Sequence, residues 1–260
     1  MFQCITYQLE AGVAVITLNR PEVMNALSTL LRAEMLAAVL RAGTQARVLV
    51  ITGAGRAFCA GQDLGDAAGQ QLGAALDLER VLNEEYVPLL KAITDCPIPT
   101  ISAVQGAAAG AGANLALAAD VVIACESASF IQAFTRIGLV PDAGGSYWLP
   151  RQIGLARAMG AVLFADKVTA SQAMDWGMIY ECVPDQGFAA HWQARALSLA
   201  QGPTRAYHGV KTALRASFGN DLDQQLALEA RLQGECGATE DFREGVAAFL
   251  EKRAAKFRGA

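Results

Sequence analysis

Asp142 is an isolated carboxylate in a long, nearly uncharged stretch of apolar segments and glycine-rich loops. From 106 to 149 only two other acids occur, Asp120 and Glu126, and both flank the strand-like run VVIAC. A lone acid in such surroundings is typical of a general base in a shielded site, where burial raises its pKa and its basicity. Directly after Pro141, the same residue could instead cap a helix. The local pattern leaves both interpretations open.

Two glycine-bearing loops each follow a predicted buried strand: 53–64 follows 48–53, and a second loop follows 100–106. Ligands bind outside the carboxyl ends of parallel strands. Ala111 stands at the start of a predicted helix, where backbone N–H groups lack partners and the helix dipole favours negative charge. A second N–H near Gln62 would complete a two-donor oxyanion site. Alternatively, the glycines only form tight turns. Neither loop carries a dinucleotide fingerprint or a phosphate-binding GK[ST] motif.

The elements that must position these loops repeat the order strand, loop, helix, strand. Such a repeat predicts an α/β fold with a mostly parallel sheet. The expected strands are 4–8, 13–18, 48–53, 100–106 and 121–125, and the expected helices are 28–42, 77–94 and one from Ala111. After about residue 150 the pattern becomes helical, and 221–257 is charged and amphipathic. We expect one α/β core over 1–200 and a helical C-terminal section over 201–260.

Composition narrows the class of protein. Apolar residues make up 53% of the 260 and the formal net charge is −4, so a nucleic-acid surface, which needs clustered basic residues, is disfavoured. The six cysteines form no CxxC motif, and the two histidines lie far from the glycine loops, so we expect no metal site. The N-terminus lacks the features of a signal peptide, and no long apolar run predicts a membrane span. We expect a soluble, cytoplasmic protein.

Six segments, in this order and spacing, resemble the crotonase (enoyl-CoA hydratase/isomerase) superfamily over essentially the whole chain. They are LNRPEVMNAL (18–27), GRAFCAGQDL (55–64), AVQGAAAGAGANLALAADVVIA (103–124), the segment 130–145, ASQAMDWGMI (170–179) and EGVAAFLEKRAAKF (244–257). The resemblance implies a crotonase-like spiral of ββα units and a C-terminal section that forms homotrimers or hexamers. It also implies acyl-CoA thioester substrates, so that coenzyme A arrives with the substrate and no separate cofactor is needed.

The resemblance also implies catalytic roles. The two oxyanion donors fall on the backbone N–H groups of Gln62 and Ala111. The two glutamates of the family's hydratases fall on Asn114 and Phe134, neither of which can transfer a proton at neutral pH. Asp142 occupies a position where some members that shift double bonds in dienoyl-CoA, or rearrange ring-epoxidised phenylacetyl-CoA, carry aspartate. The resemblance therefore implies an isomerase in which Asp142 removes the α-proton.

The strings VPDAGGSYWLPR and WGMIYECV are similar to those of members that act in phenylacetate catabolism. The implied reaction is conversion of ring-1,2-epoxyphenylacetyl-CoA to oxepin-CoA, or a double-bond shift in an enoyl-CoA. Enoyl-CoA hydration is the main alternative. A dehalogenase that uses an aspartate nucleophile, and an RNA-binding relative disfavoured by the acidic charge, are further alternatives.

Substrate contacts follow from the same resemblance. Met24 and Ala26 are expected near the adenine, and the backbone from Ala60 to Leu64, Asp63 included, along the pantetheine. Phe249 and Lys252 are expected to close the adenine and phosphate end, from a neighbouring subunit. Asn114 is expected to orient substrate or water. Phe134 is expected to form a wall of the acyl pocket, whose remaining shape depends on residues from 66–90.

Overall fold

Two sheets organise the part of the chain that this computed structural model describes, residues 2–63, 65 and 77–260. The larger sheet has the order β1 (Ile5–Glu10), β2 (Val13–Leu18), β3 (Val48–Gly53), β5 (Thr100–Val104), β7 (Val121–Cys125) and β10 (Glu181–Val183). Its strands are parallel except for the β1–β2 hairpin. The smaller sheet has the order β4 (Ala57–Cys59), β6 (Ala107–Ala109), β8 (Ser129–Ile131) and β9 (Lys167–Thr169).

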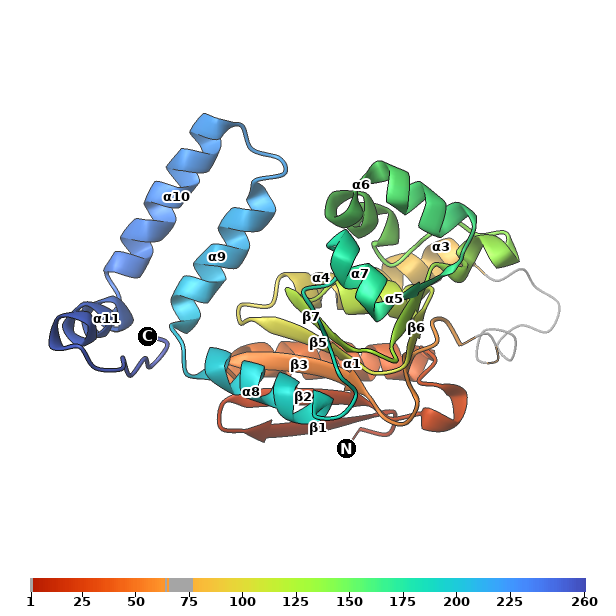
Figure 1. Ribbon diagram of the computed structural model, residues 1–260, viewed down its shortest axis with the longest axis horizontal. Coiled ribbons are helices and arrows are strands. Elements are labelled where there is room, and N and C mark those ends of the chain that lie inside the picture. Colours follow the sequence, from red (N-terminus) through yellow and green to blue (C-terminus); the bar gives the residue numbers. More distant parts are fainter. Residues whose placement is uncertain (1, 64, 66–76) are drawn as a thin grey trace.

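The chain alternates between the two sheets in successive ββα units. β3 and β4 precede α3 (Leu78–Val81), the π-helical turn η2 (Leu82–Tyr86) and α4 (Val87–Thr94); β5 and β6 precede α5 (Ala111–Leu117). β7 and β8 precede η3 (Ala133–Ile137) and α6 (Gly145–Leu163). In each unit the first strand joins the large sheet and the second joins the small one (Figure 1). This arrangement confirms the predicted α/β spiral of ββα units.

Burial explains why the strands of the large sheet are readable in the sequence. Residues 48–51 of β3 are buried without alternation, as expected for a parallel strand covered on both faces. α1 (Thr29–Gln45) and α8 (Phe188–Ala200) both pack against β2 and β3. Ser28, the first residue of the predicted helix 28–42, caps α1: its side chain accepts a hydrogen bond from the Leu31 N–H. The remaining helix of the core is α7 (Ala170–Trp176).

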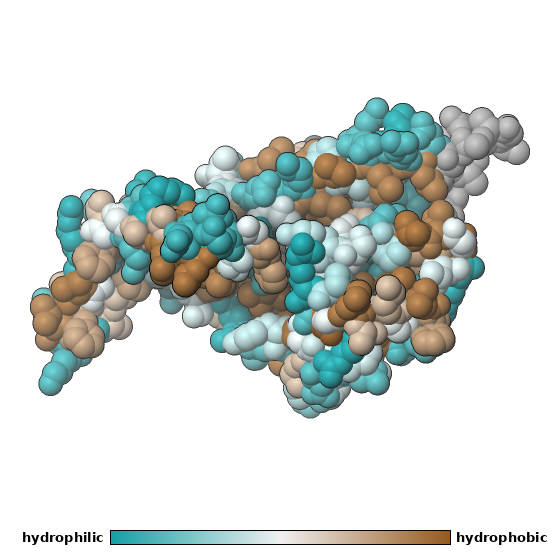
Figure 2. Space-filling model, turned by 90° about the horizontal axis from the view of Figure 1, so that it is seen from above, coloured by the Kyte–Doolittle hydropathy of each residue, from teal (hydrophilic) through white to brown (hydrophobic). Residues whose placement is uncertain are grey.

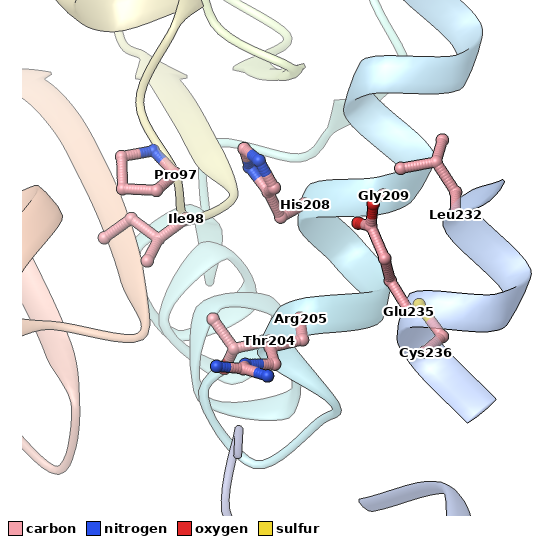
Figure 3. Close-up of a pocket in the computed structure, with 9 residues that line it drawn as sticks. All are labelled: Pro97, Ile98, Thr204, Arg205, His208, Gly209, Leu232, Glu235 and Cys236. Atoms are coloured by element: carbon pink, nitrogen blue, oxygen red, sulfur yellow. The ribbon is translucent and has the colours of Figure 1, made fainter. Parts of the chain in front are cut away.

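Three helices extend from the core as an arm: α9 (Thr204–Ala216), α10 (Leu222–Gly237) and α11 (Glu240–Glu251) (Figure 1). The carboxylate of Asp120, just before β7, forms ion pairs with Lys211 and Arg215 of α9, each with an N–O distance of 2.7 Å. A cavity of about 550 Å³ lies where the arm meets the core, lined on the core side by Pro97 and Ile98 (Figure 3). The arm is therefore tied to the sheet at a few points and otherwise stands clear of it.

Large apolar side chains remain exposed along the arm and gather at its far end (Figure 2). They include Val210, Leu214, Phe218, Leu226, Phe249 and Leu250, of which Phe249 is 82% exposed. A surface of this kind is typical of an interface between chains. Among the described residues, no helix combines the length and apolar character needed to cross a bilayer.

Candidate active site

The Gln62 backbone N–H projects away from the strand-like pairing that holds its loop. The Leu27 N–H donates to the Gly61 carbonyl at 2.8 Å, and the Asp63 N–H donates to the Leu27 carbonyl at 3.3 Å. In such a parallel bridge the N–H of the middle residue points to the opposite side. Within the described residues, the Gln62 N–H accordingly has no hydrogen-bond acceptor. It is available to a ligand.

Ala111 is the first residue of α5, as predicted. Its N–H is one of the helix-start groups that lack an intrahelical acceptor. The Gln62 loop passes directly beside it: a Cβ on Gly61 would lie 3.5 Å from the Ala111 nitrogen and 2.8 Å from the Ala109 carbonyl oxygen. Gly61 also has φ +92°, a backbone conformation that side chains disfavour. Glycine therefore allows the two candidate oxyanion donors to come together.

The side chain of Gln62 is anchored in the core by residues that sequence reasoning missed. Its Oε1 accepts hydrogen bonds from the Arg32 guanidinium, at 3.1 Å, and from the Tyr86 hydroxyl. Arg32 is only 2% exposed; it pairs with Glu85 and lies 4.7 Å from the centroid of the Tyr86 ring. One signal could have revealed it: Arg32 shares the apolar stripe of α1 with Met35 and other buried residues, where an unpaired cation would be costly.

Burial raises the pKa of Tyr86 well above its usual range, so the phenol stays protonated and able to donate. The negative charge of Asp142 raises this pKa further, while Arg32 opposes the shift. Asp142 therefore lies within electrostatic range of the phenol that anchors Gln62. The structure thus brings the predicted base and the loop of the predicted oxyanion donors into one neighbourhood.

Asp142 lies in the tight turn that leads into α6. The Gly145 N–H donates to the Asp142 carbonyl at 2.8 Å, and the turn passes through Ala143 and Gly144, both at positive φ. The helix cap is Gly144, with no side-chain cap bond, so the alternative that Asp142 caps this helix is wrong. α6 also begins earlier than the sequence indicated, at 145 rather than near 150.

The carboxylate of Asp142 is poorly solvated. Its Oδ1 is buried and has no hydrogen-bond partner within the described part of the chain. Burial raises the pKa of Asp142 to about 6, while a hydrogen bond from its own backbone N–H acts in the opposite direction. A carboxylate in this state is a stronger base than a solvated one and is still ionised at neutral pH.

Asn114 and Phe134 are both buried beside this site. The Asn114 amide donates to the Asp142 carbonyl at 2.8 Å and accepts from Gln132 at 2.9 Å. Asn114 has no exposed surface, so it lies behind the turn of Asp142 and not at a surface that substrate could reach. The Phe134 ring lies next to the loop before Ala111, with its Cζ 3.8 Å from where a Cβ on Gly110 would be.

The residues expected along coenzyme A divide into two groups. Met24 and Ala60 are joined by a 2.9 Å backbone hydrogen bond. Arg20 joins Ala26 and Asp63, because its guanidinium donates to the Ala26 carbonyl at 2.8 Å and pairs with the Asp63 carboxylate at 2.7 Å. These four expected residues therefore lie together beside Gln62.

The other expected contacts are not brought to this place within one chain. Phe249 and Lys252 belong to the end of α11, at the far tip of the arm (Figure 1). Leu64, and the part of the acyl pocket expected from 66–76, lie outside the described residues.

The fold places the chain in the crotonase class. A crystal structure of an enoyl-CoA hydratase/isomerase from Mycobacterium abscessus superposes with a TM-score of 0.92 at 38% identity, covering 98% of this chain and 100% of the other. One of an enoyl-CoA hydratase from Streptomyces coelicolor gives 0.93 at 35% identity, covering 100% and 96%. The chain belongs to the enoyl-CoA hydratase/isomerase family, whose model matches residues 8–260.

Two relatives carry different names. A probable enoyl-CoA hydratase of Rhodobacter capsulatus is 61% identical over 99% of both chains. The 1,2-epoxyphenylacetyl-CoA isomerase of Escherichia coli is 45% identical over the full length of both. The chain is accordingly an enzyme of this family, and the choice between adding water and moving a double bond depends on the residues of its site.

Proposed function

We propose that this enzyme is an acyl-CoA isomerase in which Asp142 is the base. One observation carries the proposal: within the described residues, Asp142 has a buried carboxylate oxygen without a hydrogen-bond partner, and a raised pKa, beside backbone N–H groups that have no acceptor there. The positions that match the acids of hydratases hold Asn114 and Phe134, which are buried and cannot exchange protons. The site therefore suits proton transfer better than activation of water.

In the proposed reaction, Asp142 removes a proton from the carbon next to the thioester carbonyl. The charge that develops on the carbonyl oxygen is stabilised by the N–H groups of Gln62 and Ala111. The electron pair moves along the conjugated system, where it shifts a double bond. In a ring epoxide the bond between the two epoxide carbons also breaks, both C–O bonds stay, and the six-membered ring becomes a seven-membered oxepin. The proton returns at a different carbon, so atoms and electrons balance without water or a redox partner.

We further propose ring-1,2-epoxyphenylacetyl-CoA, converted to oxepin-CoA in cytoplasmic phenylacetate catabolism, as the substrate, with an enoyl-CoA double-bond shift as the related activity. The name of the 45% identical Escherichia coli relative supports this choice. Coenzyme A would enter as part of the substrate. A homotrimer or a hexamer would bring Phe249 and Lys252 of one chain to the Met24 region of another.

Enoyl-CoA hydration is the second candidate, and the name of the 61% identical relative favours it. It would require a group to activate water. Asp142 would have to do so alone, since Asn114 and Phe134 cannot.

The deciding experiment compares wild type with Asp142→Asn. We would follow deuterium exchange at the α-carbon of phenylacetyl-CoA and enoyl-CoA substrates, and hydration of crotonyl-CoA in parallel. The proposal expects wild-type exchange, little hydration, and a decrease in exchange of about 10² to 10⁴-fold in the variant. Undiminished exchange in Asp142→Asn, or hydration by wild type at a rate that exceeds isomerisation, would reject it.

A further inference from the structure

The turn that carries Asp142 has an unfavourable backbone conformation. Ala143, which is buried, has φ +48°, and Gly144 has φ +83°. A residue with a side chain seldom adopts this left-handed conformation, and it persists only where the surroundings hold it in place. Something in the fold must therefore keep the turn from relaxing.

Two buried amides provide that hold. The Asn114 Nδ2 donates to the Asp142 carbonyl at 2.8 Å, and the Gln132 Nε2 donates to the Asn114 Oδ1 at 2.9 Å. Asn114 has no exposed surface and Gln132 is 3% exposed. The Asp142 carbonyl thus receives two donors, one from the Gly145 backbone and one from α5.

Packing keeps the Asn114 amide in this position. A Cβ on Gly145 would lie 2.3 Å from the Asn114 Nδ2 and 2.8 Å from its Oδ1. The amide therefore lies flat against the first residue of α6, in space that only glycine leaves open. Because Gln132 donates to the amide oxygen, the amide NH₂ must face the Asp142 carbonyl.

We infer that Asn114 and Gln132 are positioning residues, a relay that holds the strained turn and so fixes the carboxylate of Asp142 in its shielded position. This inference rests on the proposed function, since it concerns the base named there. It assigns Asn114 a use other than orienting substrate or water. It also extends the site to Gln132, which acts through its hydrogen bond to Asn114.

The relay makes a prediction for variants that do not touch the carboxylate. In Asn114→Ala the donor is lost, the turn relaxes and the carboxylate gains solvent. A misplaced base lowers kcat, and a displacement of about 1 Å can cost on the order of 100-fold. The pKa of the catalytic carboxyl should also fall from about 6 toward its ordinary value of 3.8. Gln132→Leu, which frees the Asn114 amide to rotate, should show the same changes to a smaller extent, roughly 10-fold in kcat.

The experiment measures kcat, KM, and the acidic limb of the pH–rate profile for wild type, Asn114→Ala and Gln132→Leu. The Asp142 carboxyl is titrated in parallel by ¹³C NMR, which needs no turnover. Thr100→Val is the matched control: Thr100 is fully buried and hydrogen-bonded to Asp120, away from this site. It should lower the melting temperature while kcat and the acidic limb stay unchanged.

The relay predicts a lower kcat, a KM within about twofold, and an acidic limb displaced to lower pH in both variants. A lower melting temperature alone, with kcat and the acidic limb of the folded variants as in wild type, would overturn the inferred relay. The two proposals fail differently. If Asp142→Asn is inactive while Asn114→Ala is fully active, the relay is wrong and the base stands. If Asp142→Asn keeps α-proton exchange, the base assignment itself is wrong.

Discussion

A single carboxylate sets how this enzyme should respond to pH. Burial raises the pKa of Asp142 to about 6, so the base is protonated below that pH. We expect kcat/KM for isomerisation to fall below pH 6 and to be nearly constant from pH 7 to 8. Rate measurements from pH 4.5 to 8.5 on the folded enzyme would check this. An acidic limb near pH 4 would show that the carboxylate is well solvated.

The same shift predicts a change in stability. Because the folded-state pKa of about 6 exceeds the ordinary 3.8, the wild-type protein loses stability as pH rises through this range and the carboxyl ionises in its shielded site. Asp142→Asn, which is neutral throughout, should be more stable than wild type at pH 8 by about 1–2 kcal/mol, allowing for residual solvent. Denaturant unfolding at pH 8 and pH 4 would measure this difference, which should be mostly lost at pH 4, close to the ordinary pKa of 3.8.

A variant of Tyr86 can test whether its hydrogen bond to Gln62 holds the loop of the Gln62 oxyanion donor in place. Tyr86→Phe removes one of the two donors to the Gln62 Oε1 and leaves the guanidinium of Arg32. We expect a loss of about 0.5–1.5 kcal/mol in the free energy of unfolding and a kcat lower on the order of 10-fold, with little change in KM. Tyr180→Phe, at a side chain that is 62% exposed, is the control. Equal kcat in the two variants would mean that the phenol does not support the loop.

At this scale the sequence identifies candidates but not their partners. The isolation of Asp142 is visible in the chain, and so is the helix start at Ala111. The contacts of Arg32 with Gln62 and Tyr86 join positions 30 and 54 residues apart, which no local pattern records. Asp142 would cap α6 only if that helix began directly after it. Ala143 and Gly144 have positive φ, so the helix begins at Gly145, and the sequence did not reveal this turn.

At the scale of elements, the approach of two loops depends on Gly61. Gly61→Ala would place a methyl 2.8 Å from the Ala109 oxygen, so the loops must separate. We expect kcat to fall by about 10² to 10³-fold, as when one oxyanion donor is lost. Gly187→Ala is a close control, because Gly187 has φ +91° and no atom within 4 Å of the added carbon. A similar loss of kcat in both variants would assign the effect to backbone strain alone.

The long strands were predictable and the short ones were not. The segments 13–18, 48–53 and 121–125 were predicted with the bounds they have, because dense β-branched and apolar residues mark strands of the large sheet. β4 (AFC) and β6 (AAA) have three residues each and fall in segments that the sequence predicts as parts of glycine-rich loops. Such strands exist because neighbouring strands pair with them, which is not a local property. The predicted helix 77–94 is likewise interrupted by the π-helical turn η2.

At the scale of the whole molecule, we propose that two chains share each site. Mixed oligomers test this. If Asp142 acts with Phe249 and Lys252 of a neighbour, Asp142→Asn and the double variant Phe249→Ala/Lys252→Ala should each be poor with coenzyme A substrates. After joint refolding, some sites would regain both wild-type halves, and activity should partly return. Two preparations of Asp142→Asn should give no recovery. Sedimentation should show three or six times the chain mass of 27.3 kDa. A monomeric, fully active enzyme would contradict the shared site.

Arg47 has a consequence for how the protein is made. From the connection between α1 and β3 it donates to the carbonyls of Gly202 and Phe257 and to the Thr204 hydroxyl, across as many as 210 residues. During synthesis Arg47 leaves the ribosome early, whereas its hydrogen-bond acceptors at 202–257 are made much later. Contacts so distant in sequence form late, after the local units have folded. The arm should therefore be the last part to settle, and a nascent chain stalled before Phe257 should hold a folded sheet with its arm still free.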